Sequence, residues 1–175
     1  MKVLLIGQLP KEIGGSYTTG VANVVYELSQ HTVEGLKYYT YGTNIKNKYA
    51  KNNSKFVNQF LGYRIRPLHI IYGLLIHPFH RIKEWNHYRK IYHVNPLHFE
   101  IYRDNFVRCI KLVKPDVINI HGTGIAPLKY ANQNFNIPIV QTFHGVSDAD
   151  DEEARRVRPQ NFDSAKLADY VTVLT

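Results

Sequence analysis

The sequence predicts a doubly wound α/β fold, in which helices cover both faces of a mainly parallel sheet. Short runs of β-branched and aromatic residues alternate along the chain with segments of helical spacing. Several of these runs, such as VLLI, DVINI and PIVQTF, are almost continuously apolar, as is typical of strands covered on both faces. Such alternation joins parallel strands through right-handed helical crossovers.

The chain has 175 residues, 44% of them hydrophobic, and can bury one sizeable core, so we expect a single domain over residues 1–175. Five strands are expected, at Lys2–Ile6, Leu36–Tyr41, Asp116–Ile120, Pro138–Phe143 and Tyr170–Leu174. Helical spacing recurs between them at 21–28, 99–113, 128–131 and 162–168. The stretch Asn44–Asn95 has no clear strand, and we expect an insertion there between the second and third strands.

The formal net charge of +8 at pH 7 indicates an anionic partner, which could be nucleic acid, an acidic lipid surface or a phosphorylated substrate. The sequence has no recognition helix, aromatic RNA-binding strand or zinc-ligand spacing, so nucleic acid is the least expected of these. The one cysteine, Cys109, cannot form an internal disulfide, which fits a reducing compartment. MKVLLIG turns polar too early for a signal peptide, so we expect a cytoplasmic protein.

No membrane-spanning segment is expected, because the longest apolar run, Ile70–Ile76, is far shorter than the about 20 residues that cross a bilayer. The segment Arg64–His93 is the most basic part of the chain and is rich in aromatic residues. One interpretation is contact with an anionic membrane surface, which would make the protein peripheral on the inner face of the cell membrane. The other is a basic helical hairpin, solvated on one side, whose tyrosines pack on the sheet. The candidate membrane contacts are Arg64, Arg66, Arg81, Lys83, Trp85, Arg89 and Lys90.

Two adjacent glycines, Gly14 and Gly15, lie between the first expected strand and the first expected helix. Backbone without Cβ atoms beside a helix N-terminus favours anions, because unpaired N–H groups point at the loop. GGSYTTG matches neither the dinucleotide fingerprint nor a P-loop, so nicotinamide and Walker-type ATP binding are not supported. Alternatively, the glycines only form a tight turn, with Ser16 or Thr18 as the helix N-cap.

Four pieces of sequence, in order, resemble the N-terminal domain of glycosyltransferase family 4, which contains retaining GT-B enzymes. They are MKVLLIGQLPKEIGGSYTTGVANVVYEL, KPDVINIHG, IPIVQTFHG and ADYVTVLT. The resemblance covers most of the chain except Asn44–Asn95. It implies a Rossmann-like domain that forms the acceptor-side half of a GT-B architecture. The C-terminal donor-binding domain would then be absent from this chain, which alone is expected to be inactive.

The resemblance implies a catalytic role for His144, beside the transferred sugar. His144 also follows an expected strand, at the edge where sheets of this type bind ligands. Its imidazole could donate a hydrogen bond to a sugar hydroxyl or stabilise charge as the bond from sugar to phosphate breaks. The residues implied in substrate binding are Gly14, Gly15, Ser16, Gly145, His121 and Gly122. For His121, a structural role is the stronger interpretation.

No cofactor or metal is expected in this domain, and the nucleotide-sugar donor would be a co-substrate of the full enzyme. Asp148-Ala149-Asp150 has the D-x-D form of metal-dependent glycosyltransferases with the other major fold, but it does not abut its strand. We expect a solvated turn and helix start there instead. No carboxylate suits a nucleophile, and the resemblance implies front-face attack, with the leaving diphosphate assisting deprotonation.

The expected function is sugar transfer from a nucleotide-sugar to a carbohydrate or lipid-linked acceptor, which the resemblance places in surface polysaccharide synthesis. The expected partners are the glycan acceptor, an anionic membrane surface and the protein's own C-terminal domain. The alternative is a free-standing, non-catalytic Rossmann-like module that binds an anionic glycan, lipid or protein.

Overall fold

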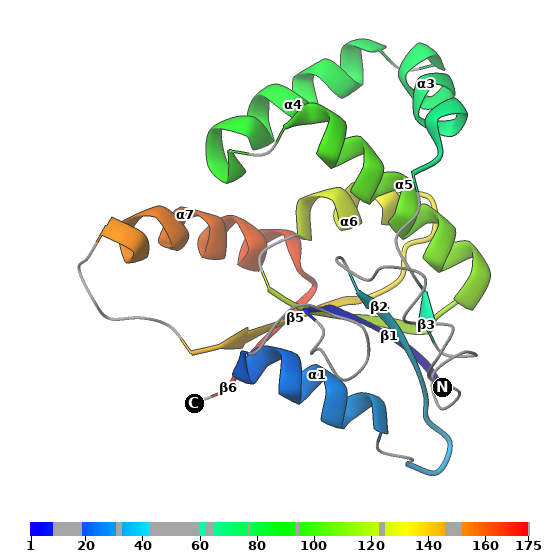
Figure 1. Cartoon of the computed structure of the whole chain (residues 1–175), viewed down its shortest axis with the longest axis vertical. Coiled ribbons are helices and arrows are strands. Elements are labelled where there is room, and N and C mark those ends of the chain that lie inside the picture. The colour runs from blue at the N-terminus through cyan, green and yellow to red at the C-terminus, as the bar shows by residue number, and fades with distance from the viewer. Residues whose placement is uncertain are drawn as a thin grey trace.

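The computed structural model describes residues 1–8, 19–30, 33–42, 60–61, 65–76, 78–93, 95–122, 125–145 and 152–174. In this part of the chain, six parallel strands form one sheet with the order β3-β2-β1-β4-β5-β6 (Figure 1). The strands are β1 (Lys2–Gly7), β2 (Lys37–Gly42), β3 (Phe60–Leu61), β4 (Val117–His121), β5 (Ile139–His144) and β6 (Tyr170–Leu174). The strand order reverses between β1 and β4, and doubly wound sheets bind ligands at the carboxyl ends of the strands beside this point.

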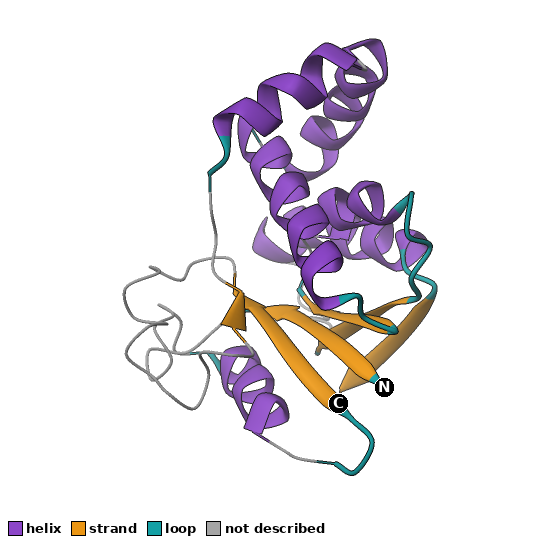
Figure 2. Ribbon diagram, turned by 90° about the vertical axis from the view of Figure 1, so that its right-hand side faces the viewer, coloured by secondary structure: helices purple, strands orange, loops and turns teal. Residues whose placement is uncertain are grey.

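Helices cover both faces of the sheet, which confirms the predicted fold class. Helix α1 lies on one face, and α5, α6 and α7 lie on the other (Figures 1 and 2). Helices α3 and α4 form a further layer that packs on α5 and α7, away from the sheet. The helices are α1 (Gly20–Gln30), α3 (Pro67–Ile76), α4 (Pro78–Tyr92), α5 (Pro96–Val113), α6 (Ile125–Asn132) and α7 (Glu152–Leu167).

The main core lies between the sheet and helices α5 and α6. It joins apolar side chains of β1, β4 and β5, such as Leu4, Ile118 and Ile139, to residues of the two helices, such as Ile110 and Leu128. All five of these side chains are at most 1% exposed. Burial of a side chain of this size contributes about 1.5–3 kcal/mol, so this layer holds the strands in place.

A second cluster is aromatic and lies between α4, α5 and α6. Tyr88 stacks on Phe99, with ring centroids 5.7 Å apart, and meets the edge of Tyr130 at 5.4 Å. The hydroxyl of Tyr92 donates to Asp163 of α7 over 2.7 Å. Tyr88 and Tyr92 of the basic segment therefore pack on neighbouring helices and Tyr72 is exposed, so the expectation that these tyrosines pack on the sheet is wrong.

Polar side chains set the ends of several elements. Asn95 caps α5 by accepting a hydrogen bond from the Leu97 N–H over 2.8 Å, and Lys114 ends this helix in the left-handed conformation, with φ 49°. Asp116, just before β4, accepts from the backbone N–H of Lys2 in β1 over 2.7 Å. Asp169, just before β6, accepts from Ile139 of β5 in the same way, over 2.8 Å.

The five strands expected from the sequence are present, with ends shifted by at most one residue. Asn44–Asn95, in which we expected no clear strand, contains the two-residue strand β3, which pairs with β2 through Thr40–Phe60 and Tyr41–Leu61. Two residues are too short to show the alternation that identifies a strand. The same stretch contains α3 and α4.

The nearly continuous apolar runs of β4 and β5 predicted strands with two apolar faces, but one face of each strand is partly polar. Ile118 and Ile120 point into the main core, so Asn119 and His121 point to the opposite face of β4, on the side of α1. In β5, Val140 and His144 are only partly buried. The sheet is thus mainly apolar toward α5 and α6, with Gln141 as a buried polar residue on that face, and partly polar toward α1.

Gly7 allows the ends of β1 and β4 to meet α1 closely. A Cβ atom at residue 7 would lie 2.9 Å from Val25 Cγ2 and 3.3 Å from His121 Cβ. We expect Gly7→Ala to lower the free energy of unfolding by about 1–3 kcal/mol, because this space is already filled. Urea denaturation followed by circular dichroism measures the change.

Two further variants show whether contact with Val25 is the cause of this loss. Val25→Ala removes the atom nearest to the new methyl group, so Gly7→Ala with Val25→Ala should lose less than the sum of the two single variants. Gly20→Ala is the control, because a Cβ atom there meets nothing within 4 Å. Additive losses in the double variant would contradict the assigned contact.

Candidate active site at the carboxyl edge of the sheet

Two histidines meet at the carboxyl edge of the sheet. His121 is the last residue of β4 and His144 is the last residue of β5. His121 Nδ1 lies 2.7 Å from His144 Nε2, and the ring centroids are 5.0 Å apart. Because β4 and β5 are parallel neighbours, with His121 opposite Thr142, a residue two positions further along β5 reaches the same edge on the same face.

Burial keeps both imidazoles neutral near pH 7. His121 is 3% exposed, and its burial and the neighbouring His144 lower its pKa to about 4. Burial also lowers the pKa of His144, which is partly accessible. Two neutral imidazoles can share one hydrogen bond, whereas two cations at this distance would repel each other.

The glycines that follow the two histidines need conformations that other residues rarely adopt. Gly122 has φ 130° and Gly145 has φ 84°. Gln141 of β5 donates from Nε2 to the carbonyl oxygen of Gly122 over 2.5 Å, so the turn after β4 is held to the neighbouring strand. Both candidate glycines therefore shape the backbone beside the histidine pair.

A row of polar side chains crosses the same face of the sheet and was missed by the sequence analysis. Thr142 of β5 donates to Asn119 Oδ1 of β4 over 2.9 Å and lies 2.8 Å from the Thr172 hydroxyl of β6. The signal was present in INIH, where apolar and polar residues alternate, and in the polar residues of IVQTFH, although we interpreted both runs as apolar. Thr142 and His144 stand two residues apart and thus on one face.

The glycine loop lies outside the described residues. Gly14, Gly15 and Ser16 fall between Gln8, after β1, and Thr19, before α1, and their proposed role stays a prediction. The two flanking residues are joined, since the Thr19 hydroxyl donates to Gln8 Oε1 over 2.9 Å. Thr19 Oγ1 also accepts from the Ala22 N–H over 3.3 Å, so Thr19 caps α1, and the expectation of Ser16 or Thr18 as N-cap is wrong.

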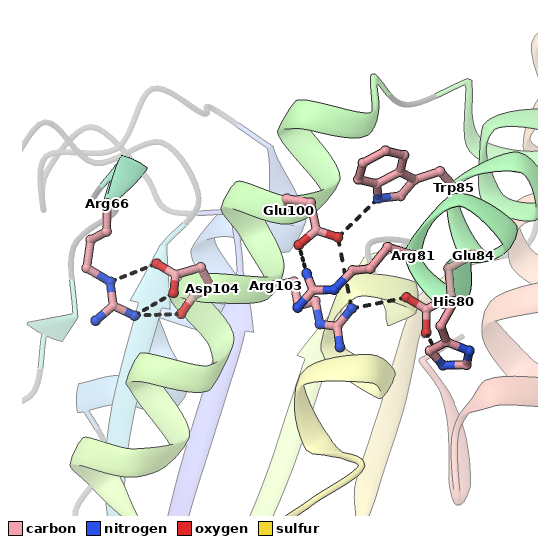
Figure 3. A network of polar contacts seen from close by, with 8 residues as sticks. All are labelled: Arg66, His80, Arg81, Glu84, Trp85, Glu100, Arg103 and Asp104. Atoms are coloured by element: carbon pink, nitrogen blue, oxygen red, sulfur yellow. Dashed lines mark hydrogen bonds and ion pairs between the residues drawn. The ribbon is translucent and has the colours of Figure 1, made fainter. Parts of the chain in front are cut away.

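Several candidate membrane contacts are used within the helical layer (Figure 3). Arg66 makes a bidentate pair with Asp104, with both distances 2.7 Å. Arg81 pairs with Glu100, and Trp85 donates to the same carboxylate over 3.0 Å. The other described candidates, Lys83, Arg89 and Lys90, are exposed, and Arg64 lies outside the described residues.

One hollow of about 520 Å³ lies far from the histidine pair, beside the amino ends of β5 and β6. It is lined by Lys129, Asn132, Gln133, Asn136, Asp169 and Tyr170, among others. The side chains of Asn132 and Asp169 are hydrogen-bonded to nearby backbone. Among the described residues, no three His, Cys, Asp or Glu side chains gather as metal ligands would, and Asp148-Ala149-Asp150 lies outside them.

The lowered pKa of His121 predicts acid sensitivity. An unfolded imidazole takes up a proton near its ordinary pKa of 6.5, but the folded one does so only near 4, so protons favour the unfolded chain between these values. The stabilisation is complete above about pH 6.5 and is lost as the pH falls toward 4. From pH 7.5 to 5, we expect the wild type to lose about 2 kcal/mol more unfolding free energy than His121→Phe.

Urea denaturation at the two pH values measures this difference. His69→Phe is the control for replacement of a histidine by phenylalanine, because His69 is exposed on α3. An equal pH dependence in wild type and His121→Phe would contradict the expected result.

Comparison with known proteins shows the fold. UDP-GlcNAc 2-epimerase from Methanocaldococcus jannaschii matches all of this chain with TM-score 0.54 and 11% identity, over 40% of its own length. MurG from Acinetobacter baumannii also matches the whole chain, with TM-score 0.48 and 14% identity, over 42% of its length. No protein-family model matches the sequence, and no curated protein is significantly similar to it in sequence. The chain shares a Rossmann-like fold with the epimerase and spans about two fifths of the length of both structures.

Proposed function

We propose that this chain forms the acceptor-side domain of a glycosyltransferase that moves a sugar from a nucleotide-sugar to a carbohydrate or lipid-linked acceptor. The observation that carries the proposal is the contact of His121 with His144 at the carboxyl edge of the sheet, beside the reversal of strand order. The sequence resemblance supports a retaining enzyme of glycosyltransferase family 4 that acts in the cytoplasm in surface polysaccharide synthesis.

In this proposal, His144 borders the transferred sugar. It is the more accessible of the two histidines, so it is the one that could meet a substrate oxygen. Gly14, Gly15 and Ser16 would present backbone N–H groups to phosphate or acceptor. Donor recognition would belong to a second domain, which would close the site and leave the diphosphate to assist deprotonation of the acceptor.

The test is an assay of the complete protein with a panel of labelled nucleotide-sugars, each with and without a lysate-derived mixture of glycans and lipid-linked glycans. Product that forms only in the presence of acceptor supports sugar transfer. If the nucleotide-sugar is isomerised without any acceptor, the protein has an isomerase activity and the proposed sugar transfer is wrong. Binding without turnover of any donor would support the non-catalytic module.

We also propose that the surface of α3 and α4 contacts an anionic membrane, from which a lipid-linked acceptor would arrive. Eight large apolar side chains on or beside these helices are between 47% and 86% exposed. They are Ile65, Leu68, Ile71, Tyr72, Leu75, Ile76, Phe79 and Ile82. No helix in the described part of the chain is both long and apolar enough to cross a bilayer. Contact would therefore be made by side chains at the lipid surface.

The charge of the same surface supports an anionic partner. Within residues 65–76 and 78–93, Glu84 is the one carboxylate, and it is 4% exposed. Lys83, Arg89 and Lys90 are exposed. Every acidic or basic side chain that this surface exposes, apart from its histidines, is thus cationic, as an anionic lipid headgroup requires.

We expect the protein to sediment with vesicles of phosphatidylglycerol and phosphatidylcholine but not with phosphatidylcholine alone, and to be released by salt. Replacing Lys83, Arg89 and Lys90 together by Gln should weaken binding by about 3 kcal/mol, at about 1 kcal/mol for each cation. The control replaces three exposed lysines elsewhere, Lys111, Lys114 and Lys166, by Gln. Equal sedimentation with both vesicle types, or an equal loss of vesicle binding in both triple variants, would exclude this surface as the membrane contact.

A further inference from the structure

The contact between the two histidines holds a single proton. His121 Nδ1 and His144 Nε2 are 2.7 Å apart, so one of these nitrogens carries the hydrogen and the other accepts it. Each neutral imidazole has one N–H in total, which means that the direction of this bond fixes the proton position on both rings. Two arrangements are possible.

In the first arrangement, His144 Nε2 is the donor. His121 then accepts at Nδ1 and must carry its own hydrogen at Nε2. This atom is buried and has no hydrogen-bond partner in the part of the chain that the structure describes. Buried N–H groups without a partner are rare in folded proteins and are costly, because the lost contact with water is not replaced.

In the second arrangement, His121 Nδ1 is the donor. His121 Nε2 then carries only a lone pair, so the His121 ring has no buried N–H without an acceptor. His144 accepts at Nε2 and carries its hydrogen at Nδ1. Of the residues that the structure describes, none hydrogen-bonds His144 Nδ1, so this N–H is free for a ligand.

We propose that His121 is a positioning residue that holds His144 in the Nδ1–H tautomer, so that His144 meets its substrate as a hydrogen-bond donor. The partner of this donor is an oxygen atom that carries a lone pair or negative charge, such as a sugar hydroxyl or a phosphate oxygen. His144 is therefore not the base that removes the acceptor proton. This inference deepens the proposed sugar transfer and rests on it for the identity of the substrate, but the tautomer itself can be measured without any substrate.

The experiment is long-range ¹H–¹⁵N correlation spectroscopy of the 175-residue chain labelled with ¹⁵N-histidine, at pH 7.5, where both rings are neutral. The signals are assigned by single replacements of His121 and His144. We expect both histidines to show a protonated Nδ1 and an unprotonated Nε2. A protonated Nε2 on either ring in the wild type would overturn the proposal.

Replacement of His121 tests whether it sets the tautomer. In His121→Leu, which removes the donor, we expect the His144 shifts to move toward the averaged values of a ring that exchanges between its two tautomers. His121→Phe serves the same purpose if the leucine variant does not fold, and His69→Leu is the matched control on exposed α3. Unchanged His144 shifts in a folded His121 variant would also overturn the proposal.

The activity readout separates this inference from the proposed function. In the complete enzyme, we expect His121→Leu to lower kcat by about 10- to 100-fold with a smaller change in KM, the range that is typical for partners that orient a ligating histidine. If the complete protein transfers no sugar, the proposed function fails while the tautomer measurement still stands. If transfer occurs and His121→Leu keeps full kcat, the positioning role fails while the function stands.

Discussion

The Glu100→Gln variant is expected to lose about 3–5 kcal/mol of unfolding free energy, because it leaves a buried arginine without its counter-ion. Glu100 lies on α5 and is 2% exposed. One carboxylate oxygen pairs with Arg81 of α4, whose side chain is 12% exposed, and the other accepts from Trp85 Nε1 over 3.0 Å (Figure 3). This carboxylate therefore joins α4 to α5.

The neighbouring charges increase this cost. Burial and the positive charge of Arg103 lower the pKa of Arg81 to about 10, so Arg81 stays charged at neutral pH. Arg103 pairs with Glu84, which is 4% exposed, over 3.0 Å. Without the Glu100 charge, Arg81 and Arg103 share one buried carboxylate, that of Glu84. The protein interior cannot screen the repulsion between the two arginines as water does.

Urea denaturation measures the loss, and the exposed pair Lys129–Asp169 gives the control. Its side chains are 37% and 42% exposed, so Lys129→Ala should cost at most about 1 kcal/mol. Replacing both partners by apolar residues, Arg81→Met with Glu100→Leu, should cost less than Glu100→Gln, because no unpaired charge remains in the interior. A Glu100→Gln loss no larger than that of Lys129→Ala would show that the network contributes little.

Under the proposed sugar transfer, the His144→Ala variant of the complete protein is expected to lower kcat about 100- to 1000-fold, the effect of removing one donor that stabilises charge in the transition state. His144 is partly accessible, but its loss leaves the buried His121 Nδ1–H without an acceptor, so the free energy of unfolding should fall by about 1–3 kcal/mol. A large loss of turnover in a variant that remains folded distinguishes a catalytic group from a structural one.

Turnover and urea denaturation should be measured on the same preparation. His69→Ala is the control for loss of a histidine, since His69 is exposed on α3. Unchanged turnover in His144→Ala would show that His144 is structural. If His144→Ala were unfolded under the assay conditions, its loss of turnover would not support a catalytic role for His144.

Local sequence was sufficient to predict five of the six described strands and the edge of the sheet at which the candidate site lies. Runs such as VLLI and DVINI are apolar because their side chains fill the core, and this requirement is visible within five residues. His121 and His144 could be selected because both follow such runs, and the carboxyl ends of parallel strands meet at one edge. Strand β3 could not be found this way, since its two residues show no pattern.

The partners of the polar side chains were decided only by the tertiary structure. The contact of His121 with His144 depends on the register of β4 and β5, and the register depends on packing of the whole sheet. Arg81 and Trp85 suggested lipid contact in the sequence, but the crossing of α4 over α5 brings them to Glu100. A sequence shows which groups are charged, but the free energy of a charge depends on its burial and on its nearest neighbours, which are often distant in the chain.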